Sequence, residues 1–272
     1  MRLEDRTPRS EDIVNLTCYP IHTPGSSEYR NLIHTCRKRV KKAGVCILPE
    51  FITQDAIRMM VSQTDRIVGD AYTCYDEHNA YLSKEDPGFP EDHPRRKKQR
   101  TSLDVLGYDL IGPEDGLHVL YTWDALVAFI ADVLSKDVLY RMADPLAAVT
   151  VNVMHEGQHQ GWHFDEAEIT TSIMLQEPEA GGQFEYVPHL RDKDHARYDA
   201  VDQVLNGTHP GIRTLDIVPG TMVIFAGHYA MHRVTTVVGG TTRYMAILCF
   251  KDRPGVRNSP EVQLLFYGKT AE

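Results

Sequence analysis

The chain has 272 residues with 29 Lys and Arg against 38 Asp and Glu, so its formal net charge is −9 with histidine neutral. At 42% hydrophobic and 25% charged residues, the composition is typical of a globular protein and excludes disorder, collagen and coiled coil as descriptions of the whole chain. The acidic balance argues against nucleic acid as a partner, because phosphate neutralisation requires concentrated basic residues. The one basic run, residues 93–100, is most simply a solvated loop.

Membrane and disulfide classes are also disfavoured. No apolar run approaches the roughly 18 to 20 residues that cross a bilayer. The opening Met-Arg-Leu-Glu-Asp lacks the charged and apolar blocks of a signal peptide, so we expect a cytoplasmic protein without membrane contact. The five cysteines are widely spaced and never form C-x-x-C, which predicts reduced thiols: Cys18, Cys36, Cys46, Cys74 and Cys249.

The N-terminal half predicts helices and a long loop. Residues 1–26 are rich in Pro, Ser and Thr and indicate an irregular arm. Residues 27–140 form the helical flank of the expected domain. Within them, periodicity and caps predict helices over 28–42, 53–67 and 121–136, a short strand over 44–48, and a loop over 70–118. Long loops in compact domains often serve as substrate lids.

After Pro145 the pattern changes to short β-branched runs separated by Gly and Pro. The predicted strands are 147–154, 169–176, 183–187, 214–218, 222–225, 232–238 and 241–250, with a helical or irregular insertion at 191–212. Such strands indicate a sandwich or barrel. We therefore predict one mainly β (α+β) domain: a double-stranded β-helix (jelly-roll, cupin-like) core over 141–250, flanking N-terminal helices, and a C-terminal segment over 251–272.

The segment 155–165 has two interpretations. On a helix, three histidines four residues apart would share one face, as zinc ligands of a hydrolase do. They are His155, His159 and His163. Two glycines inside the segment and the strand pattern before it argue against a helix. On an extended strand, residues i and i+2 share a face, so His163 and Asp165 would converge on one point.

His232 is the best candidate for a third ligand, because it opens a strand that ends at a Gly-Gly hairpin signal, Gly239-Gly240. A two-residue loop would pair Thr236 with Arg243 and would turn His232, Thr236 and Arg243 inward together. Arg243 would then lie roughly 13 Å along the strand from His232. That separation leaves room for a short dicarboxylate between a metal on His232 and the Arg243 guanidinium.

Two His and one Asp with open positions form the facial triad of non-haem Fe(II) oxygenases. Three protein ligands leave sites for a chelating 2-oxoacid and O₂. The H-x-D at 163–165, the distal His232, the Arg eleven residues later and the run Pro-Gly-Thr-Met-Val-Ile-Phe at 219–225 resemble the Fe(II)/2-oxoglutarate dioxygenase superfamily. The resemblance implies that His163, Asp165 and His232 hold Fe(II) and that Arg243 and Thr236 contact 2-oxoglutarate.

A closer resemblance covers roughly residues 140–250. The runs at 152–154, 161–165 and 174–188 are similar to enzymes that hydroxylate or halogenate free amino acids, including lysine halogenases. Halogenases of that group carry Gly where this chain has Asp165, so the resemblance implies hydroxylation. It assigns Asn152 to the co-substrate site, Arg100 to the substrate carboxylate, and Glu166 or His159 to the substrate amine.

Two apolar positions narrow the expected substrate. Ile247 and Cys249 stand where that group has polar residues for the lysine side chain, which implies a smaller or apolar amino acid or a close derivative. Desaturation or oxidative cyclisation of the same substrate, a zinc hydrolase and a non-catalytic jelly-roll binding module stay open as alternatives. We expect an oxidoreductase of secondary metabolism with a small-molecule substrate; a homodimer is compatible with the sequence.

Overall fold

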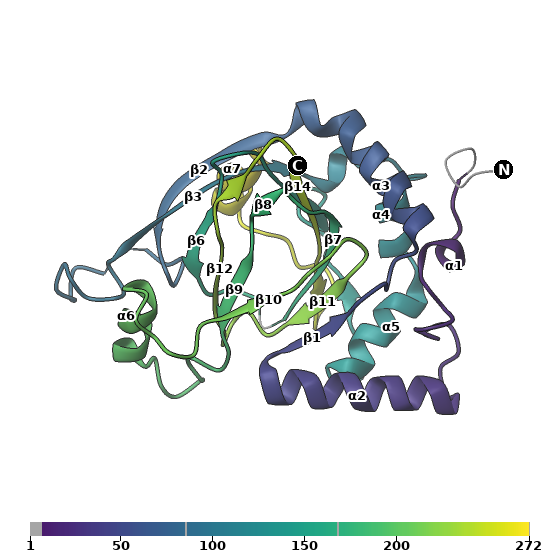
Figure 1. Ribbon diagram of the computed structural model, residues 1–272, viewed down its shortest axis with the longest axis horizontal. Helices are drawn as coiled ribbons and strands as arrows, with labels where there is room; N and C mark the ends of the chain where they lie inside the picture. Colours follow the sequence, from purple (N-terminus) through teal and green to yellow (C-terminus); the bar gives the residue numbers. More distant parts are fainter. Residues whose placement is uncertain (1–6, 85, 168, 272) are drawn as a thin grey trace.

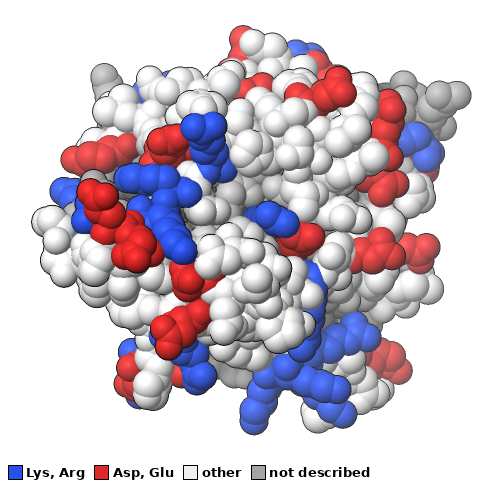
Figure 2. All heavy atoms as spheres, turned by 60° about the vertical axis from the view of Figure 1, so that its left-hand side comes forward, with Lys and Arg blue, Asp and Glu red and all other residues white. Residues whose placement is uncertain are grey.

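The computed structural model describes residues 7–84, 86–167 and 169–271 (Figure 1). Its strands pair antiparallel throughout the described ladders. They form a seven-stranded sheet, a four-stranded sheet and two two-stranded pairs. The prediction of a mainly β fold with large antiparallel sheets is therefore confirmed. Basic and acidic side chains are interspersed over most of the face drawn in Figure 2.

The seven-stranded sheet has the order β1-β11-β7-β14-β5-β3-β2. In that order its strands are Val45–Leu48, Met222–Phe225, Thr170–Gln176, Arg243–Leu248, Val149–Met154, Lys98–Leu106 and Tyr72–Asn79. The four-stranded sheet β10-β9-β12-β6 contains Arg213–Leu215, Phe184–Val187, Met231–Val234 and Gln160–His163. The two small pairs join β13 (Val237–Val238) to β8 (Ala180–Gly181) and β15 (Phe250–Lys251) to β4 (Tyr140–Arg141).

The helices follow the expected caps. They are α1 (Ser10–Ile13), α2 (Ser27–Ala43), α3 (Gln54–Ile67), α4 (Gly116–Tyr121), α5 (Asp124–Val133), α6 (Tyr198–Leu205) and α7 (Pro260–Tyr267), with single 3₁₀ turns η2 (Val68–Asp70) and η3 (Tyr108–Leu110). Thr53 caps α3 by accepting a hydrogen bond from the Ala56 N–H, and Gly44 ends α2 in the left-handed conformation. Within the described ranges, no helix has both the length and the apolar character that a membrane crossing requires.

One face of the large sheet carries the main core. Helices α2 to α5 lie beside this sheet in Figure 1, and their apolar stripes pack with its outward residues, among them Tyr244 and Ala246 of β14. The alternate residues of the same strand, Arg243, Met245 and Ile247, line a cavity instead. Because side chains alternate along a strand, one strand anchors the helical layer and also builds the cavity wall.

The predicted loop over 70–118 is wrong. Strands β2 and β3 occupy much of it and extend the large sheet as an antiparallel hairpin. The dense Pro and Gly residues near 87–94 belong only to the connection between them. Alternating burial of Thr101, Leu103 and Val105 marks β3 as a half-buried strand. The helix predicted over 121–136 is present as the shorter helix α5, which begins at Asp124 and ends at Val133, and the separate helix α4 precedes it.

The predicted Gly-Gly hairpin is also wrong. Strand β12 pairs with β9 and β6, whereas β14 pairs with β5 and β7 in the other sheet. The run 232–238 is broken after Val234, where the Thr235 N–H donates to the Gln183 carbonyl and the Thr236 carbonyl accepts from the Gly182 N–H. The chain therefore changes sheets between His232 and Arg243, although both residues face the same cavity.

Candidate metal centre and active site

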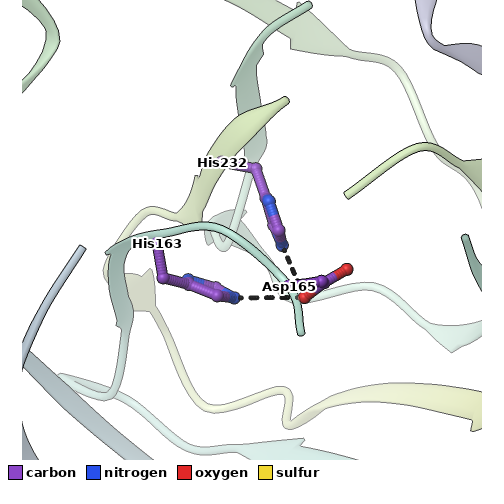
Figure 3. A group of neighbouring side chains, drawn as sticks. All are labelled: His163, Asp165 and His232. Carbon is purple, nitrogen blue, oxygen red and sulfur yellow. Dashed lines mark ion pairs between the residues drawn. The ribbon is translucent and has the colours of Figure 1, made fainter. Parts of the chain in front are cut away.

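Three potential metal ligands meet between neighbouring strands (Figure 3). His163 ends β6 and lies directly opposite His232 of β12, and Asp165 follows two residues after His163. The Asp165 Oδ1 atom lies 3.7 Å from His163 Nε2 and 3.4 Å from His232 Nε2. One ligand atom from each residue lies within 4.8 Å of the other two, so a single ion can contact all three.

Backbone carbonyls fix both imidazole rings. His163 Nδ1 lies 2.8 Å from the Gly161 carbonyl oxygen, and His232 Nδ1 lies 3.0 Å from that of Ala230. A carbonyl oxygen only accepts, so each Nδ1 carries the proton and donates it. Each Nε2 then presents a lone pair toward Asp165, which is the orientation that a metal-ligating histidine requires.

The Asp165 carboxylate is held by close packing and one hydroxyl. Thr170 Oγ1 donates to its Oδ2 at 2.5 Å. A Cβ atom placed on Gly227 would come within 1.9 Å of the same oxygen. No real contact is that short, so only glycine leaves room for this carboxylate position.

Electrostatics keep two of these groups, His163 and Asp165, in the protonation states that a metal needs. Burial, together with the neighbouring His232, lowers the pKa of His163 to about 3. Burial alone would raise the pKa of the Asp165 carboxyl, but His232, His163 and the Thr170 hydroxyl outweigh it and hold the pKa well below its ordinary value. A neutral His163 imidazole and a buried carboxylate result. Two imidazoles and one carboxylate fit the donor set of a non-haem ferrous ion.

The triad opens into a cavity of about 240 Å³ between the two large sheets. Most of its wall is apolar: Ile169, Phe184, Ile217, Val223, Phe225, Val234, Met245, Ile247, Leu248 and Phe250. Such walls exclude water and strengthen the electrostatic interactions inside. The charged residues of the lining are Asp165, Glu166, Arg243 and Lys251.

Arg243 is a buried cation at the wall of this cavity. It is 1% exposed, and its Nε donates to the Gly182 carbonyl at 3.0 Å. Among the described residues no carboxylate forms an ion pair with it. Burial lowers its pKa to about 10, so it stays charged at neutral pH. A buried guanidinium without a counter-ion is costly, and an anionic ligand would remove that cost.

A second cavity, of about 390 Å³, meets the first at shared wall residues. Arg243, Phe184 and Ile217 line both. The second cavity is otherwise lined by Met174 of β7, by the segment 177–183, and by residues 214–216 in and after strand β10. Gly182 adopts φ +58°, and a Cβ there would lie 3.0 Å from Arg243 Cδ, so this segment packs directly on the guanidinium arm.

The other residues singled out from the sequence divide into two groups. Asn152, Glu166, Ile247 and Cys249 line the metal cavity. The lining, as far as the described residues define it, does not include Thr236, Arg100 or His159.

The positions of these three residues explain why they do not line the metal cavity. Arg100 of β3 is 67% exposed and pairs with Glu77 at 2.9 Å. His159 is half-buried and forms a backbone bridge with Ser102. Thr236 lies in the break between β12 and β13. In this conformation none of the three reaches the metal cavity.

Four polar residues of the cavity were not singled out from the sequence: Gln160, Thr170, Ser172 and Lys251. Gln160 places its Nε2 3.4 Å from His163 Nε2, and Lys251 lines the cavity from β15. Gln160 lies three residues before His163 and has no motif of its own. Lys251 continues the alternation of Ile247 and Cys249 by one more step, which is a signal that a longer strand prediction would have found.

The helical zinc interpretation of residues 155–163 is wrong. The segment from Gln160 to His163 is strand β6, and a turn precedes it. His155 points elsewhere, with its Nε2 3.3 Å from Asp104 and its Nδ1 3.1 Å from the Thr242 hydroxyl. The three histidines therefore do not share one face.

Comparison with known families agrees with this geometry. The family model for halogenase D matches residues 29–259, which is most of the chain. The chain belongs to the halogenase D family. The protein is therefore an enzyme of the Fe(II)/2-oxoglutarate oxygenase superfamily, and the resemblance to this superfamily seen in the sequence motifs is confirmed. No curated protein matches the sequence of this halogenase D family member.

Solved structures share the fold of this halogenase D family member at low identity. The carbocyclase SnoK from nogalamycin biosynthesis has a TM-score of 0.57 at 14% identity, covering 90% of this chain and 95% of that chain. AviO1 from Streptomyces viridochromogenes Tue57 has a TM-score of 0.55 at 14% identity, and the match covers 84% of this chain and 97% of that chain. HygX from Streptomyces hygroscopicus, with nickel and 2-oxoglutarate bound, has a TM-score of 0.52 at 14% identity, and the match covers 83% of this chain and 86% of that chain. At this identity the likeness concerns the fold.

Proposed function

We propose that the protein is an Fe(II)- and 2-oxoglutarate-dependent oxygenase that hydroxylates an unactivated C–H bond of a free amino acid, small or apolar, or of a close derivative. The observation that carries the proposal is the pairing, in one cavity, of the triad His163, Asp165 and His232 with Arg243 as a buried cation that has no carboxylate partner among the described residues. Family membership and the antibiotic-biosynthesis origin of the fold neighbour SnoK support an enzyme of secondary metabolism.

Each element of the proposal has named residues. His163, Asp165 and His232 would hold the ferrous ion, and Arg243 would bind the distal carboxylate of 2-oxoglutarate with Asn152 beside it. When bound, the ferrous ion with 2-oxoglutarate and O₂ would supply the oxidising power for C–H cleavage, with one oxygen atom entering the substrate and the other entering the succinate formed from 2-oxoglutarate as CO₂ leaves. An Arg fork suits a carboxylate because two parallel N–H donors match its two oxygens.

The protein itself orients the groups and keeps the site dry. The Gly161 and Ala230 carbonyls hold the rings of His163 and His232, and Thr170 holds the carboxylate. The enclosing apolar walls keep bulk water from the reacting carbon. The two facing sheets support a double-stranded β-helix and one dioxygenase domain as the architecture behind this arrangement.

The carboxylate at position 165 supports oxygenation over halogenation. In the halogenases that the sequence resembles, glycine at this position vacates a site for halide. Here Asp165 occupies that space, and Gly227 is shaped around its Oδ2 atom. A third protein ligand therefore stands where halide would bind, although the family takes its description from a halogenase.

The test is an anaerobic incubation with Fe(II), 2-oxoglutarate and a panel of free amino acids, followed by O₂. We expect at least one small or apolar amino acid to stimulate succinate release and to gain one oxygen atom by mass analysis. A product that has lost two hydrogen atoms would show that the reaction is desaturation or cyclisation and not hydroxylation. If no amino acid stimulates succinate release, the proposed substrate class of free amino acids is wrong.

A further inference from the structure

Strand β6, which carries the metal ligand His163, is joined to strand β3 of the large sheet just before that ligand. One backbone bridge connects them, in which Ser102 and His159 each donate an N–H to the other's carbonyl, at 2.8 and 3.0 Å. Beyond this bridge a side chain continues the connection, since the Gly161 N–H donates to the Thr101 hydroxyl oxygen at 3.1 Å. One hydroxyl therefore holds the backbone two residues before the ligand.

Gly161 links the position of β6 to the orientation of the His163 ring. Its carbonyl accepts the hydrogen bond from His163 Nδ1 at 2.8 Å. A Cβ atom on Gly161 would lie 2.6 Å from the Arg100 carbonyl oxygen, so only glycine lets β6 approach β3 this closely. Glycine also leaves the backbone more conformational freedom than any other residue does. A hydrogen bond from outside β6 is therefore needed to fix the carbonyl that orients the ring.

A directed chain of hydrogen bonds lies behind this glycine. Thr101 is 4% exposed, and its Oγ1 lies 2.8 Å from His78 Nε2. His78 Nδ1 lies 3.1 Å from the Asn79 carbonyl oxygen, which only accepts, so Nδ1 carries the proton. In the neutral ring Nε2 then accepts from the Thr101 hydroxyl. This fixes the direction of the hydroxyl and leaves a lone pair of Oγ1 facing the Gly161 N–H.

His78 also contacts the ligand ring itself. The rings of His78 and His163 meet edge to face, with centroids 6.1 Å apart and an interplanar angle of 83°. The lining of the metal cavity, over the part of the chain that the structure describes, includes neither His78 nor Thr101. The two residues therefore act on the centre through His163 and Gly161 and do not meet a ligand in the cavity.

We propose that Thr101 and His78 are positioning residues of the metal centre. Thr101 fixes the backbone at Gly161, and His78 fixes the Thr101 hydroxyl, so that the Gly161 carbonyl directs His163 Nε2 toward the ion. This assignment rests on the proposed function in taking the triad as a metal site. It extends the support of the centre to the β2–β3 hairpin, which contributes no metal ligand.

The experiment compares three variants with the wild type. Thr101→Val keeps the shape and removes the hydroxyl, Thr101→Ser keeps the hydroxyl, and His78→Phe keeps an aromatic ring and removes both nitrogen atoms. Thr73→Val is the matched control, because Thr73 lies exposed on the same hairpin. Competition with a metal indicator measures Co(II) affinity, and the visible absorption of bound Co(II) reports the geometry of its ligands. Thermal denaturation without metal checks the fold.

We expect Thr101→Val to weaken Co(II) binding about 10-fold, the effect of losing a partner behind a metal-ligating histidine, and to change the Co(II) spectrum. His78→Phe changes both in the same direction by a smaller factor. Thr101→Ser restores the wild-type affinity and spectrum, and Thr73→Val does not alter them. With Fe(II), kcat falls in Thr101→Val while KM for 2-oxoglutarate stays constant, because the distal carboxylate binds elsewhere, on Arg243.

Three results would overturn the assignment. Wild-type Co(II) affinity and spectrum in Thr101→Val, even with a lowered melting temperature, would show that the hydroxyl only stabilises the fold. A loss in Thr101→Ser as large as in Thr101→Val would make side-chain volume the cause. Wild-type values in His78→Phe would remove His78 from the chain of hydrogen bonds.

Failure of the proposed function gives a different result. A wild type that binds Co(II) but oxidises no amino acid would overturn the proposed function and leave the positioning roles standing. A wild type that binds no metal would overturn both.

Discussion

The metal cavity has a closed end, where the triad and Arg243 are buried, and an open end, where Glu166 and Lys251 lie, and the two ends differ in how their polar groups are held. At the closed end, His163, His232 and Arg243 are each 5% exposed or less, and each is bonded to a backbone carbonyl. At the open end, Glu166 is exposed and Lys251 has no partner among the described residues. A rigid end suits a metal and a constant co-substrate, whereas adaptable side chains suit a substrate that differs between relatives.

The largest effect is expected from removing a triad ligand. Asp165→Ala should abolish succinate release and bring bound iron to background, because two imidazoles alone leave the ion without its anionic ligand. Iron content and turnover check this. His155→Ala is the control, since His155 contacts Asp104 and Thr242 outside the triad. Wild-type iron content in Asp165→Ala would contradict the ligand assignment.

Next in size is the removal of the buried cation. Arg243→Met should raise KM for 2-oxoglutarate about 10- to 100-fold, and Arg243→Lys should recover little of it, because one ammonium cannot replace the planar fork. Without ligand, Arg243→Met should raise the free energy of unfolding by about 1 to 3 kcal/mol, since a buried charge without a counter-ion is lost. Denaturant titration measures this. A less stable variant with normal KM would mean that Arg243 is structural.

Crowding the carboxylate should have an intermediate effect. In Gly227→Ala the new methyl group would overlap Asp165 Oδ2, so the carboxylate must move, and metal affinity should fall about 10-fold or more. Gly69→Ala is the control, because nothing lies within 4 Å of a Cβ there. Competition with a metal indicator measures both. Equal metal affinity of the two variants would contradict a steric role for Gly227.

The smallest effect is expected from the hydroxyl beside the triad. Thr170→Val keeps the shape and removes the donor to Asp165 Oδ2, so metal affinity should fall by up to about 10-fold with the fold intact. Thr170→Ser keeps the hydroxyl and serves as the control. An unchanged affinity in Thr170→Val would show that packing by Gly227 alone positions the carboxylate.

The sequence predicted what depends on local alternation and missed what depends on pairing between strands. Side chains alternate between the two faces of an extended segment, so Arg243, Ile247 and Cys249 share one face whatever strand they pair with. Their positions on the cavity wall therefore did not depend on the predicted hairpin. Thr236 was placed inward only through that hairpin, and the chain changes sheets there instead.

The N-terminal errors have a similar cause. Proline and glycine between 87 and 116 suggested loop across the whole of 70–118, although irregular chain is largely confined to the connection between β2 and β3 and to the turns around η3. The assignment of Arg100 to the substrate carboxylate came from resemblance alone and stays a prediction; in the structure its side chain pairs with Glu77 on the surface of that hairpin. Lys251 followed from the same alternation as Cys249 but lay beyond the last predicted strand.

A crystal structure of the protein grown with Mn(II) and 2-oxoglutarate would show directly whether the triad and Arg243 hold these two ligands. We predict one ion ligated by His163 Nε2, His232 Nε2 and an Asp165 oxygen, with the distal carboxylate of 2-oxoglutarate on the Arg243 guanidinium. An ion that lacks any of the three ligands, or a 2-oxoglutarate carboxylate away from Arg243, would contradict it.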